Sequence, residues 1–229
     1  MKTSSRLSSE NRRQAIVDAV KGIFAEKGFD GTTTRELAKA AGVSEALLYK
    51  HFPSKESLYA AMLDACAQGP GLVEYNRILT LEPSTSTLVI MVHFLMSHFV
   101  QGRFEHRDKE VLDRLAVRSL LEDGEFIRLA HTKFTDAYVA KFGACLKAAA
   151  RAGELRQIPV RGDLRGWFAH HVAFGLMLHL HPKIPAVQYK ATRDALVEQA
   201  VWFSLIGAGV KEAAIRRYYN PKALSLLAG

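Results

Sequence analysis

The strongest constraint on the fold is a pair of short helices whose ends are marked by capping residues. The four residues that begin at Thr33 form a capping box, because the Thr33 hydroxyl accepts from the amide of Glu36 and the Glu36 carboxylate accepts from the amide of Thr33. Gly42 ends this helix after about two turns, and Ser44 is the expected N-cap of the next helix. The second helix, predicted over residues 45–51, ends before Pro53, which disfavours helical geometry in the residue before it.

A longer amphipathic helix precedes the pair and begins at about Ser9. One apolar face is formed by residues at helical spacing, namely Ile16, Val20, Ile23 and Phe24. Lys21 and most of the other charged residues fall on the remaining faces, and Gly28 is the expected cap at the end. A packing helix, two short helices and a tight glycine turn together predict a helix-turn-helix, whose last helix enters the major groove of DNA.

Short motifs continue at fixed spacing through this region, from Arg12 to Met62. They are Gly28-Phe29, Thr32-Thr33, Leu37-Ala38, Ala41-Gly42-Val43-Ser44, Leu48-Tyr49, His51-Phe52 and Ser54-Lys55-Glu56, with Leu58 following. The whole series resembles the TetR family of transcriptional regulators, whereas an isolated Ala-Gly-Val-Ser would be weak evidence. The resemblance implies a dimeric, all-helical effector domain behind the DNA-binding domain. It therefore implies a ligand-responsive repressor that binds a palindromic operator as a homodimer and is released by a small molecule.

The recognition helix is predicted to have one face for the core and one for DNA. Leu48 and Phe52 are four residues apart and therefore share the face that anchors the helix. Tyr49 and His51 match family positions that contact phosphate or base. With residues from the neighbouring helix starts, the predicted DNA-binding set is Thr33, Thr34, Glu45, Ala46, Leu47, Tyr49, Lys50, His51 and Lys55.

Four members of this set have alternative roles. Tyr49 is either a DNA contact or a partly buried ring that packs the helix. The Leu47 methyl groups either meet a thymine methyl or pack against the first helix. Glu45 either accepts from a cytosine amino group or only complements the positive end of the helix dipole. Thr33 caps its helix whether or not it also donates to a phosphate.

Lys55 is the most informative charge in this region. It follows Pro53 and Ser54 and so lies in the first turn of the next helix, where the helix dipole disfavours a cation. A phosphate at that helix start would reverse the balance, because the exposed amides and the ammonium would both face an anion. The family position agrees, and Lys55 is therefore predicted to contact phosphate.

The rest of the chain has no alternating strand pattern, so the expected fold class is all-α. After a break at Gly69-Pro70-Gly71, helices are expected at about residues 84–101, 108–121, 125–152, 164–179 and 192–207, with a short one before Pro221. We therefore divide the chain into a flexible N-terminal arm (1–8), a helix-turn-helix domain (9–54), a connecting helix (55–68) and a ligand-binding and dimerisation domain (69–229).

The resemblance also implies an effector pocket and a dimer interface beyond the DNA-binding domain. The pocket candidates, for each of which ordinary core packing is the alternative, are Met62, Phe94, His98, Phe134, Tyr138, Phe142, His171, Phe174 and Met177. The last two long helices are apolar nearly all round, which is typical of burial on several sides, and in the family they form a four-helix dimer interface. The dimer candidates are Trp167, His170, Gly175, Leu178, Val201, Trp202 and Leu205.

Composition bounds the partners and the compartment. The formal charge is +8, from 31 Lys and Arg against 23 Asp and Glu, but most of the excess lies beyond the first 64 residues. Charge therefore does not locate the DNA-binding surface; it favours an apolar, neutral or anionic effector over a cationic one. The polar start, the lack of an apolar stretch long enough to span a bilayer and two distant cysteines predict a cytoplasmic protein with no membrane partner.

The nine histidines suggest a rival function, a helical metal-dependent enzyme. The pairs His170-His171 and His179-Leu180-His181 lack the i, i+4 spacing that places two ligands on one helix face. Neither a His-Glu-x-x-His nor a Cys-x-x-Cys motif occurs. We therefore expect no enzymatic activity, no metal and no cofactor, and the expected partners are double-stranded operator DNA, a small-molecule effector and a second copy of the chain.

Overall fold

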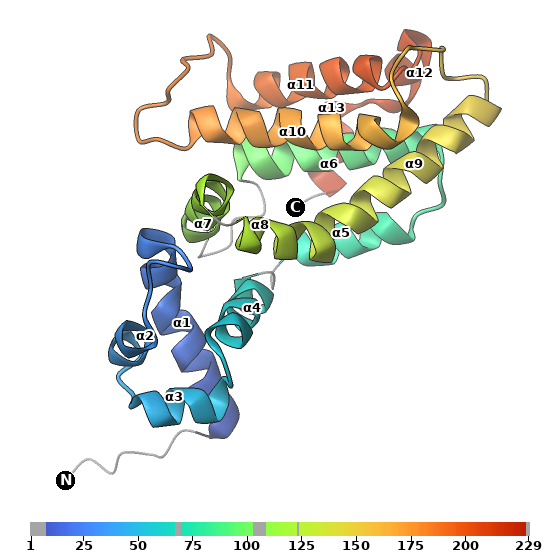
Figure 1. Ribbon diagram of the computed structural model, residues 1–229. Helices are drawn as coiled ribbons and strands as arrows, with labels where there is room; N and C mark the ends of the chain where they lie inside the picture. Colours follow the sequence, from blue (N-terminus) through green and yellow to red (C-terminus); the bar gives the residue numbers. More distant parts are fainter. Residues whose placement is uncertain (1–7, 67–69, 103–108, 123, 228–229) are drawn as a thin grey trace. The chain divides into compact units, whose positions relative to one another are not determined.

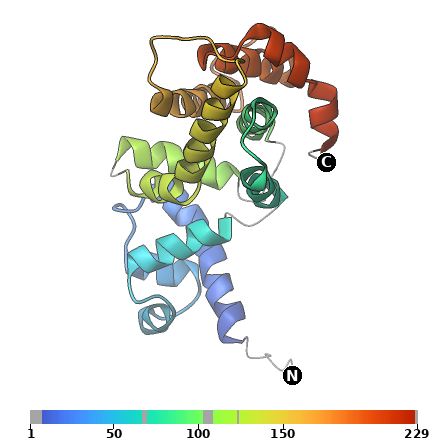
Figure 2. The same cartoon turned by 90° about the vertical axis from the view of Figure 1, so that its right-hand side faces the viewer.

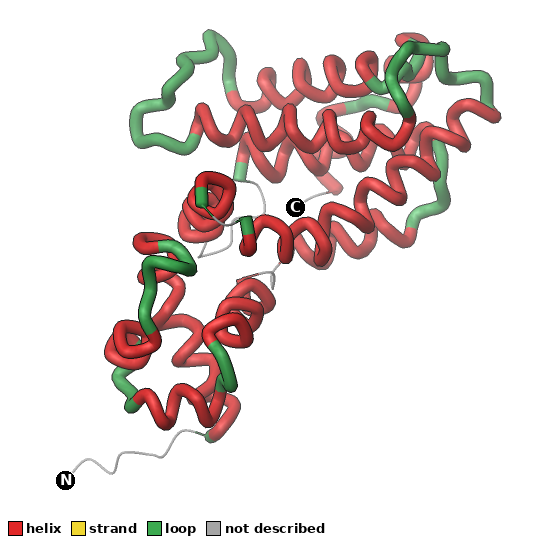
Figure 3. The backbone as a smooth tube through the Cα atoms, in the orientation of Figure 1, coloured by secondary structure: helices red, strands yellow, loops and turns green. Residues whose placement is uncertain are grey.

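The computed structural model describes residues 8–66, 70–102, 109–122 and 124–227. Within these ranges it consists of helices joined by loops, with no strand beyond one isolated bridge between Leu155 and Val210 (Figure 3). The all-α prediction is confirmed. The predicted N-terminal arm, residues 1–8, lies outside the described residues except for Ser8.

The chain forms two compact units that interleave along the sequence. The first unit comprises Met1–Gln68 and His106–His131, and the second comprises Gly69–Glu105 and Thr132–Gly229. The described residues of this second segment, 109–122 and 124–131, thus belong with the N-terminal segment, although the sequence analysis places them within a domain that starts at residue 69. Each unit has its own buried side chains.

The first unit is built on its longest helix. Its helices are α1 (Ser9–Lys27), α2 (Thr34–Ala40), α3 (Glu45–His51), α4 (Lys55–Cys66), α7 (Lys109–Leu121) and α8 (Glu125–Ala130). Helix α1 packs against α2, α4 and α7, and α4 packs against α8 (Figures 1 and 2). The buried apolar side chains include three of the four predicted on α1, namely Ile16, Val20 and Phe24, and the two anchors of α3, Leu48 and Phe52. Ile23, the fourth residue of the predicted face, is half-buried.

Lys21 is a correction to the predicted polar face of α1. Its residue is only 7% exposed, and its ammonium pairs with Asp18 at 2.7 Å. Because α7 packs on α1 in addition to α2 and α4, more than one face of α1 is covered. The amphipathic pattern alone did not reveal this extra packing, since α7 comes from a distant part of the chain.

The second unit surrounds a central helix. Its helices are α5 (Pro70–Thr80), α6 (Thr85–Gln101), α9 (Asp136–Arg151), α10 (Gly162–Leu180), α11 (Arg193–Gly207), α12 (Glu212–Tyr218) and α13 (Pro221–Leu227). Helix α6 packs against all six of the others, and its buried residues occur on every face. An apolar helix that lacks a polar face belongs in such a position.

The structure differs from the predicted helices in two respects. The helix expected over residues 125–152 is divided into α8, a π-helical segment at His131–Thr135 and α9. In addition, α5 and α13 begin at Pro70 and Pro221, which the sequence analysis treated as breaks. Proline is compatible with the first turn of a helix, because that position needs no amide donor. None of the helices in the described ranges is both long and apolar enough to cross a membrane.

Candidate DNA-binding site

Helix α3 is anchored on one face and exposed on the other. Ser44 caps its start by accepting from the amide of Leu47 at 3.2 Å, while Leu48 and Phe52 are 2% and 1% exposed. The exposed face carries Glu45, Ala46, Tyr49 and Lys50. Tyr49 is 45% exposed, so its ring is not packed into the core. Leu47 and His51 lie half-buried beside this face.

The start of α2 is closed by the predicted capping box. The amide of Thr33 donates to Glu36 Oε2 at 2.9 Å, and the amide of Glu36 donates to Thr33 Oγ1 at 3.3 Å. The Thr33 hydroxyl also donates to Glu36 Oε2 at 2.9 Å, so its proton is already engaged within the box. Lys27 Nζ pairs with Glu36 Oε1 at 2.6 Å. Hydrogen bonds from Lys27 and then from Thr33 lower the pKa of Glu36 to about 2.

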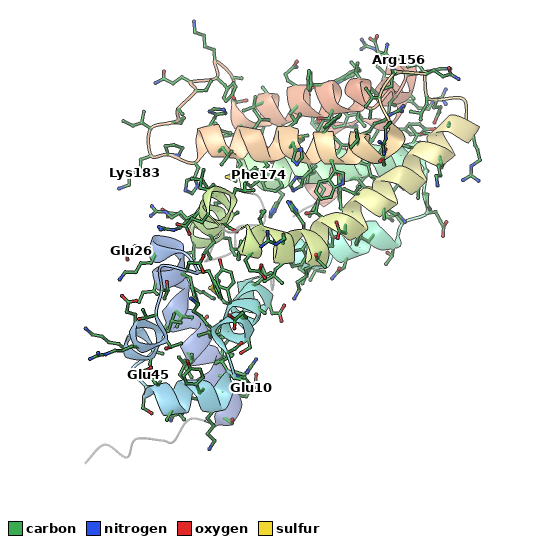
Figure 4. All side chains as sticks on the ribbon, viewed as in Figure 1. Glu10, Glu26, Glu45, Arg156, Phe174 and Lys183 are labelled. Atoms are coloured by element: carbon green, nitrogen blue, oxygen red, sulfur yellow. The ribbon has the colours of Figure 1, made fainter. Side chains whose placement is uncertain are left out.

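A side-chain contact joins the starts of α2 and α3. Thr34 Oγ1 donates to Glu45 Oε2 at 3.4 Å, a long hydrogen bond between two partly or fully exposed residues. Glu45 is the first residue of α3 and is labelled in Figure 4. Because this carboxylate lies at the positive end of the helix dipole and has a partner on α2, both alternatives for its role remain compatible with its position.

Lys55 lies against the loop that leads into α2. Its ammonium donates to the carbonyl oxygens of Phe29 at 2.7 Å and Thr32 at 3.1 Å, and it lies 4.1 Å from the centroid of the Phe29 ring. These oxygens offset the unfavourable position of the cation in the first turn of α4. An ammonium has three donors, and two of them are used here. Lys55 therefore has a structural role that the sequence analysis missed, beside the predicted phosphate contact.

These contacts bring the predicted DNA-binding residues into one unit. Thr32, whose carbonyl binds Lys55, directly precedes Thr33, and Thr34 contacts Glu45 on α3. The nine predicted residues thus belong to the start of α2, the recognition helix and the start of α4.

The predicted pocket residues are divided between the two units. Met62 is fully buried in the first unit, and the other eight lie in the second. A group of rings from α5, α6 and the π-helical segment is in contact: Tyr75 lies 6.4 Å from Phe94 and 6.3 Å from Phe134, and Phe94 stacks on His98 at 6.2 Å between centroids. The Tyr75 hydroxyl donates to the Phe134 carbonyl.

Tyr138 carries a buried hydroxyl in the second unit. Its residue is 3% exposed, its ring lies 6.2 Å from that of Phe142, and its hydroxyl has no hydrogen-bond partner among the described residues. Burial raises the pKa of this hydroxyl, so it stays a neutral donor. On α10, Phe174 is half-buried, His171 is exposed and Met177 is 2% exposed, so these three predicted residues do not share one environment (Figure 4 labels Phe174).

A cavity of about 260 Å³ lies elsewhere in the second unit, between the end of α10 and the start of α11. Its lining residues include none of the predicted pocket set; they are Leu180, Pro185, Val187, Gln188, Tyr189, Ala191, Arg193 and Leu196. Within the described ranges, no group of three or more His, Cys, Asp or Glu side chains is arranged to hold a metal ion.

The dimer candidates require a correction. Val201 and Leu205 are 0% exposed within the core around α6. His170 is 8% exposed and its ring lies 5.6 Å from that of Phe99 on α6, so these three residues offer almost no surface to a partner. Trp167 and Trp202 are half-buried, whereas Leu178 is 37% exposed. A Cβ atom added at Gly175 would have no atom within 4 Å, so no close contact within the described chain requires a glycine there.

The exposed apolar surface of α10 and α11 is formed mainly by residues that the sequence analysis did not choose. On α10, Leu164 and Phe168 are 37% and 51% exposed and continue at helical spacing through His171 and Gly175 to Leu178. On α11 the exposed residues are Phe203 and Ile206, at 68% and 39%. We call this surface, defined by Leu164, Phe168, Leu178, Phe203 and Ile206, the α10–α11 face.

Comparison with known proteins finds the clearest similarity in the helix-turn-helix region. Residues 16–62 match the family model described as bacterial regulatory proteins, tetR family. The sequence is 29% identical over 137 residues to nucleoid occlusion factor SlmA of Haemophilus ducreyi, covering 59% of this chain and 64% of the relative. It is 41% identical over 54 residues to IcaR of Staphylococcus aureus, the HTH-type negative transcriptional regulator of the biofilm operon icaADBC, covering 24% of this chain and 29% of that protein. The chain thus spans less than two thirds of these curated relatives.

Solved structures extend the likeness to most of the chain. The structure of AibR in complex with isovaleryl coenzyme A and operator DNA has a TM-score of 0.59 at 19% identity, covering 84% of this chain and 97% of AibR. The TetR family transcriptional regulator PfmR of Thermus thermophilus has a TM-score of 0.54 at 20% identity, covering 86% of this chain and 99% of PfmR. At these identities the likeness shows a shared fold.

Proposed function

We propose that this chain, whose residues 16–62 match the model of the TetR family of bacterial regulatory proteins, is a homodimeric repressor of that family that binds a palindromic operator through α3 and is released by a small molecule. The observation that carries the proposal is the exposed face of α3. Its four side chains, Glu45, Ala46, Tyr49 and Lys50, project from a helix whose cap and core anchors are in place. In a helix-turn-helix, such a face meets base edges in the major groove.

The α10–α11 face supports the homodimer. Five large apolar side chains between 37% and 68% exposed lie on α10 and α11, which pack against each other, and an accumulation of exposed apolar side chains favours an interaction site. A two-fold dimer would pair this face with itself. Helix-turn-helix dimers in general bind two half-sites about 34 Å apart, one turn of DNA.

The rings that contact Tyr75, together with the Tyr138–Phe142 pair, support a small-molecule effector in the second unit. Phe94, Phe134 and Phe142 supply apolar surface, and the buried Tyr138 hydroxyl offers one hydrogen-bond donor. These groups suit an apolar molecule that is neutral or anionic and carries one acceptor oxygen. AibR, which shares the fold, was crystallised with an acyl coenzyme A and with operator DNA.

The regulation we propose is thermodynamic linkage. An effector that binds better to a dimer whose recognition helices are misplaced lowers the affinity for the operator, and operator lowers the affinity for the effector by the same factor. The family consists of transcriptional regulators, and no observation on this chain favours the metal-enzyme alternative over this function.

The experiment uses the purified full chain and the DNA that flanks its coding sequence. We expect a retarded complex of two chains on one duplex, with an affinity that exceeds that for scrambled DNA of equal length. Equal affinity for the two duplexes over a range of salt concentrations would contradict the proposal.

A further inference from the structure

Arg13, near the start of α1, contacts the far end of α3. Its Nη1 atom donates to the carbonyl oxygen of His51 at 2.7 Å, and its guanidinium carbon lies 4.2 Å from the centroid of the Phe52 ring. His51 is the last residue of α3, and Phe52 is its C-cap. Figure 1 shows the start of α1 beside this end of α3.

The contact fits the chemistry of a helix C-terminus. The last carbonyl groups of a helix have no partner within the helix, and they form the negative end of its dipole. A guanidinium satisfies such a carbonyl and also stacks on an aromatic ring, because its donors lie in one plane; an ammonium has no such plane. Phe52 is 1% exposed, so the ring beneath Arg13 is held by the core.

The two ends of α3 are held in different ways. At the start, Ser44 caps the helix and Glu45 is bonded to Thr34. At the end, Arg13 of α1 donates to the His51 carbonyl, and Tyr49 and Lys50 lie in the same last turn of α3. Loss of Arg13 would leave Leu48 and Phe52 in the core but would free the last turn of α3, which carries two of its four exposed side chains, to fray and change its angle.

We infer that Arg13 is a positioning residue, which fixes the angle of α3 so that its side chains reach base edges. Arg13 does so through the His51 carbonyl and the Phe52 ring, and not by neutralising a DNA phosphate. This inference rests on the proposed DNA-binding function.

The test compares Arg13→Met and Arg13→Lys with Arg12→Met, which removes the same charge from the neighbouring position. The first readout is amide hydrogen exchange in the full chain without DNA. The second is the ratio of affinities for two probes: the duplex that the wild-type chain recovers from a random-sequence library, and a scrambled duplex of equal length. Both affinities are measured over a range of salt concentrations.

We expect both Arg13 variants to exchange faster at residues 49–52, with unchanged protection in α1 and α2. The affinity ratio should fall by at least about fivefold, since each lost base contact costs this much or more. The dependence of affinity on salt should not change. Arg12→Met should leave both the exchange of α3 and the ratio as in the wild type.

Three results would overturn the inference: unchanged exchange in α3, an unchanged affinity ratio, or a ratio restored in full by Arg13→Lys. A salt slope that is shallower by about 0.9 per subunit, with an unchanged ratio, would identify Arg13 as a phosphate contact instead. If the wild-type chain recovers no duplex, the proposed function fails, and hydrogen exchange then decides by itself whether Arg13 holds α3.

Discussion

Replacing Lys55 with methionine should destabilise the first unit, although the position of the charge alone suggests the opposite. A cation in the first turn of α4 interacts unfavourably with the helix dipole, so its removal by itself would stabilise the fold by up to about 1 kcal/mol. The structure adds two hydrogen bonds from the ammonium, to Phe29 O and Thr32 O, and a contact with the Phe29 ring. A bond that involves a charged group contributes about 1.5–3 kcal/mol, and an exposed cation–ring contact about 0.5 kcal/mol.

At the lower end of these ranges the two bonds and the ring contact contribute about 3.5 kcal/mol, so relief of the dipole leaves a net loss of about 2.5 kcal/mol. Water can reach part of this site, since Lys55 is half-buried, and we therefore expect a loss of about 2 kcal/mol. Methionine retains most of the aliphatic stem over Phe29, which isolates the loss of the charged donors. The change corresponds to a roughly thirtyfold fall in the protection of slowly exchanging amides in α1 to α4.

The assay is amide hydrogen exchange of the full chain, with Lys147→Met as the control because Lys147 is exposed on α9. Unchanged protection in the Lys55 variant would refute the structural role. DNA binding tests the phosphate contact separately, at a temperature where both proteins are folded. Loss of one phosphate contact per subunit should make the slope of log affinity against log salt shallower by about 0.9 for each subunit. An unchanged slope would leave Lys55 with its structural role alone.

Three further predictions concern the caps, the dimer and the buried hydroxyl. The pKa of Glu36 is about 2 in the folded chain, below the ordinary value of 4.5. The stabilisation by the Glu36 carboxylate is therefore complete above pH 4.5 and is lost as the pH falls toward 2. Acid unfolding of Glu36→Gln, followed by circular dichroism, should depend less on pH in that window, and an unchanged profile would refute the role of the carboxylate. Phe203→Glu should lower the mass measured by light scattering from about twice the 25.4 kDa chain mass to that of the monomer. Val73→Glu, at an equally exposed position on α5, should leave the dimer intact. A dimeric Phe203 variant would exclude the α10–α11 face as the dimer interface. Tyr138→Phe should raise the free energy of unfolding measured in urea by up to about 1 kcal/mol, because it removes a buried hydroxyl that has no partner among the described residues; a lower free energy of unfolding would show that the hydroxyl is hydrogen-bonded in solution.

The local features of the helix-turn-helix were predictable because their signals lie within a few residues of one another. The Thr33–Glu36 capping box and the Ser44 cap join residues three positions apart. The core anchors Leu48 and Phe52 lie one helical turn apart. Such interactions are determined by the backbone geometry of the helix itself.

The features that the sequence missed depend on packing between distant segments. Lys21 is buried in a unit whose α1 is also covered by α7, nearly a hundred residues further on, and Lys55 bonds to a loop more than twenty residues earlier. In α11 the apolar residues occupy nearly all faces, so the pattern did not reveal that Val201 faces the core while Phe203 faces outward. Tertiary contacts decide which face of such a helix is covered.

The most direct test of the central claim is a hydroxyl-radical footprint on the duplex that the wild-type chain recovers from a random-sequence library. We predict two protected half-sites related by two-fold symmetry, with centres about 10 base pairs apart, because each subunit presents one α3 helix. Tyr49→Ala should lose this footprint while its circular dichroism spectrum stays unchanged, since the Tyr49 ring is 45% exposed and outside the core. A single asymmetric footprint, or an unchanged footprint in the Tyr49 variant, would contradict the account.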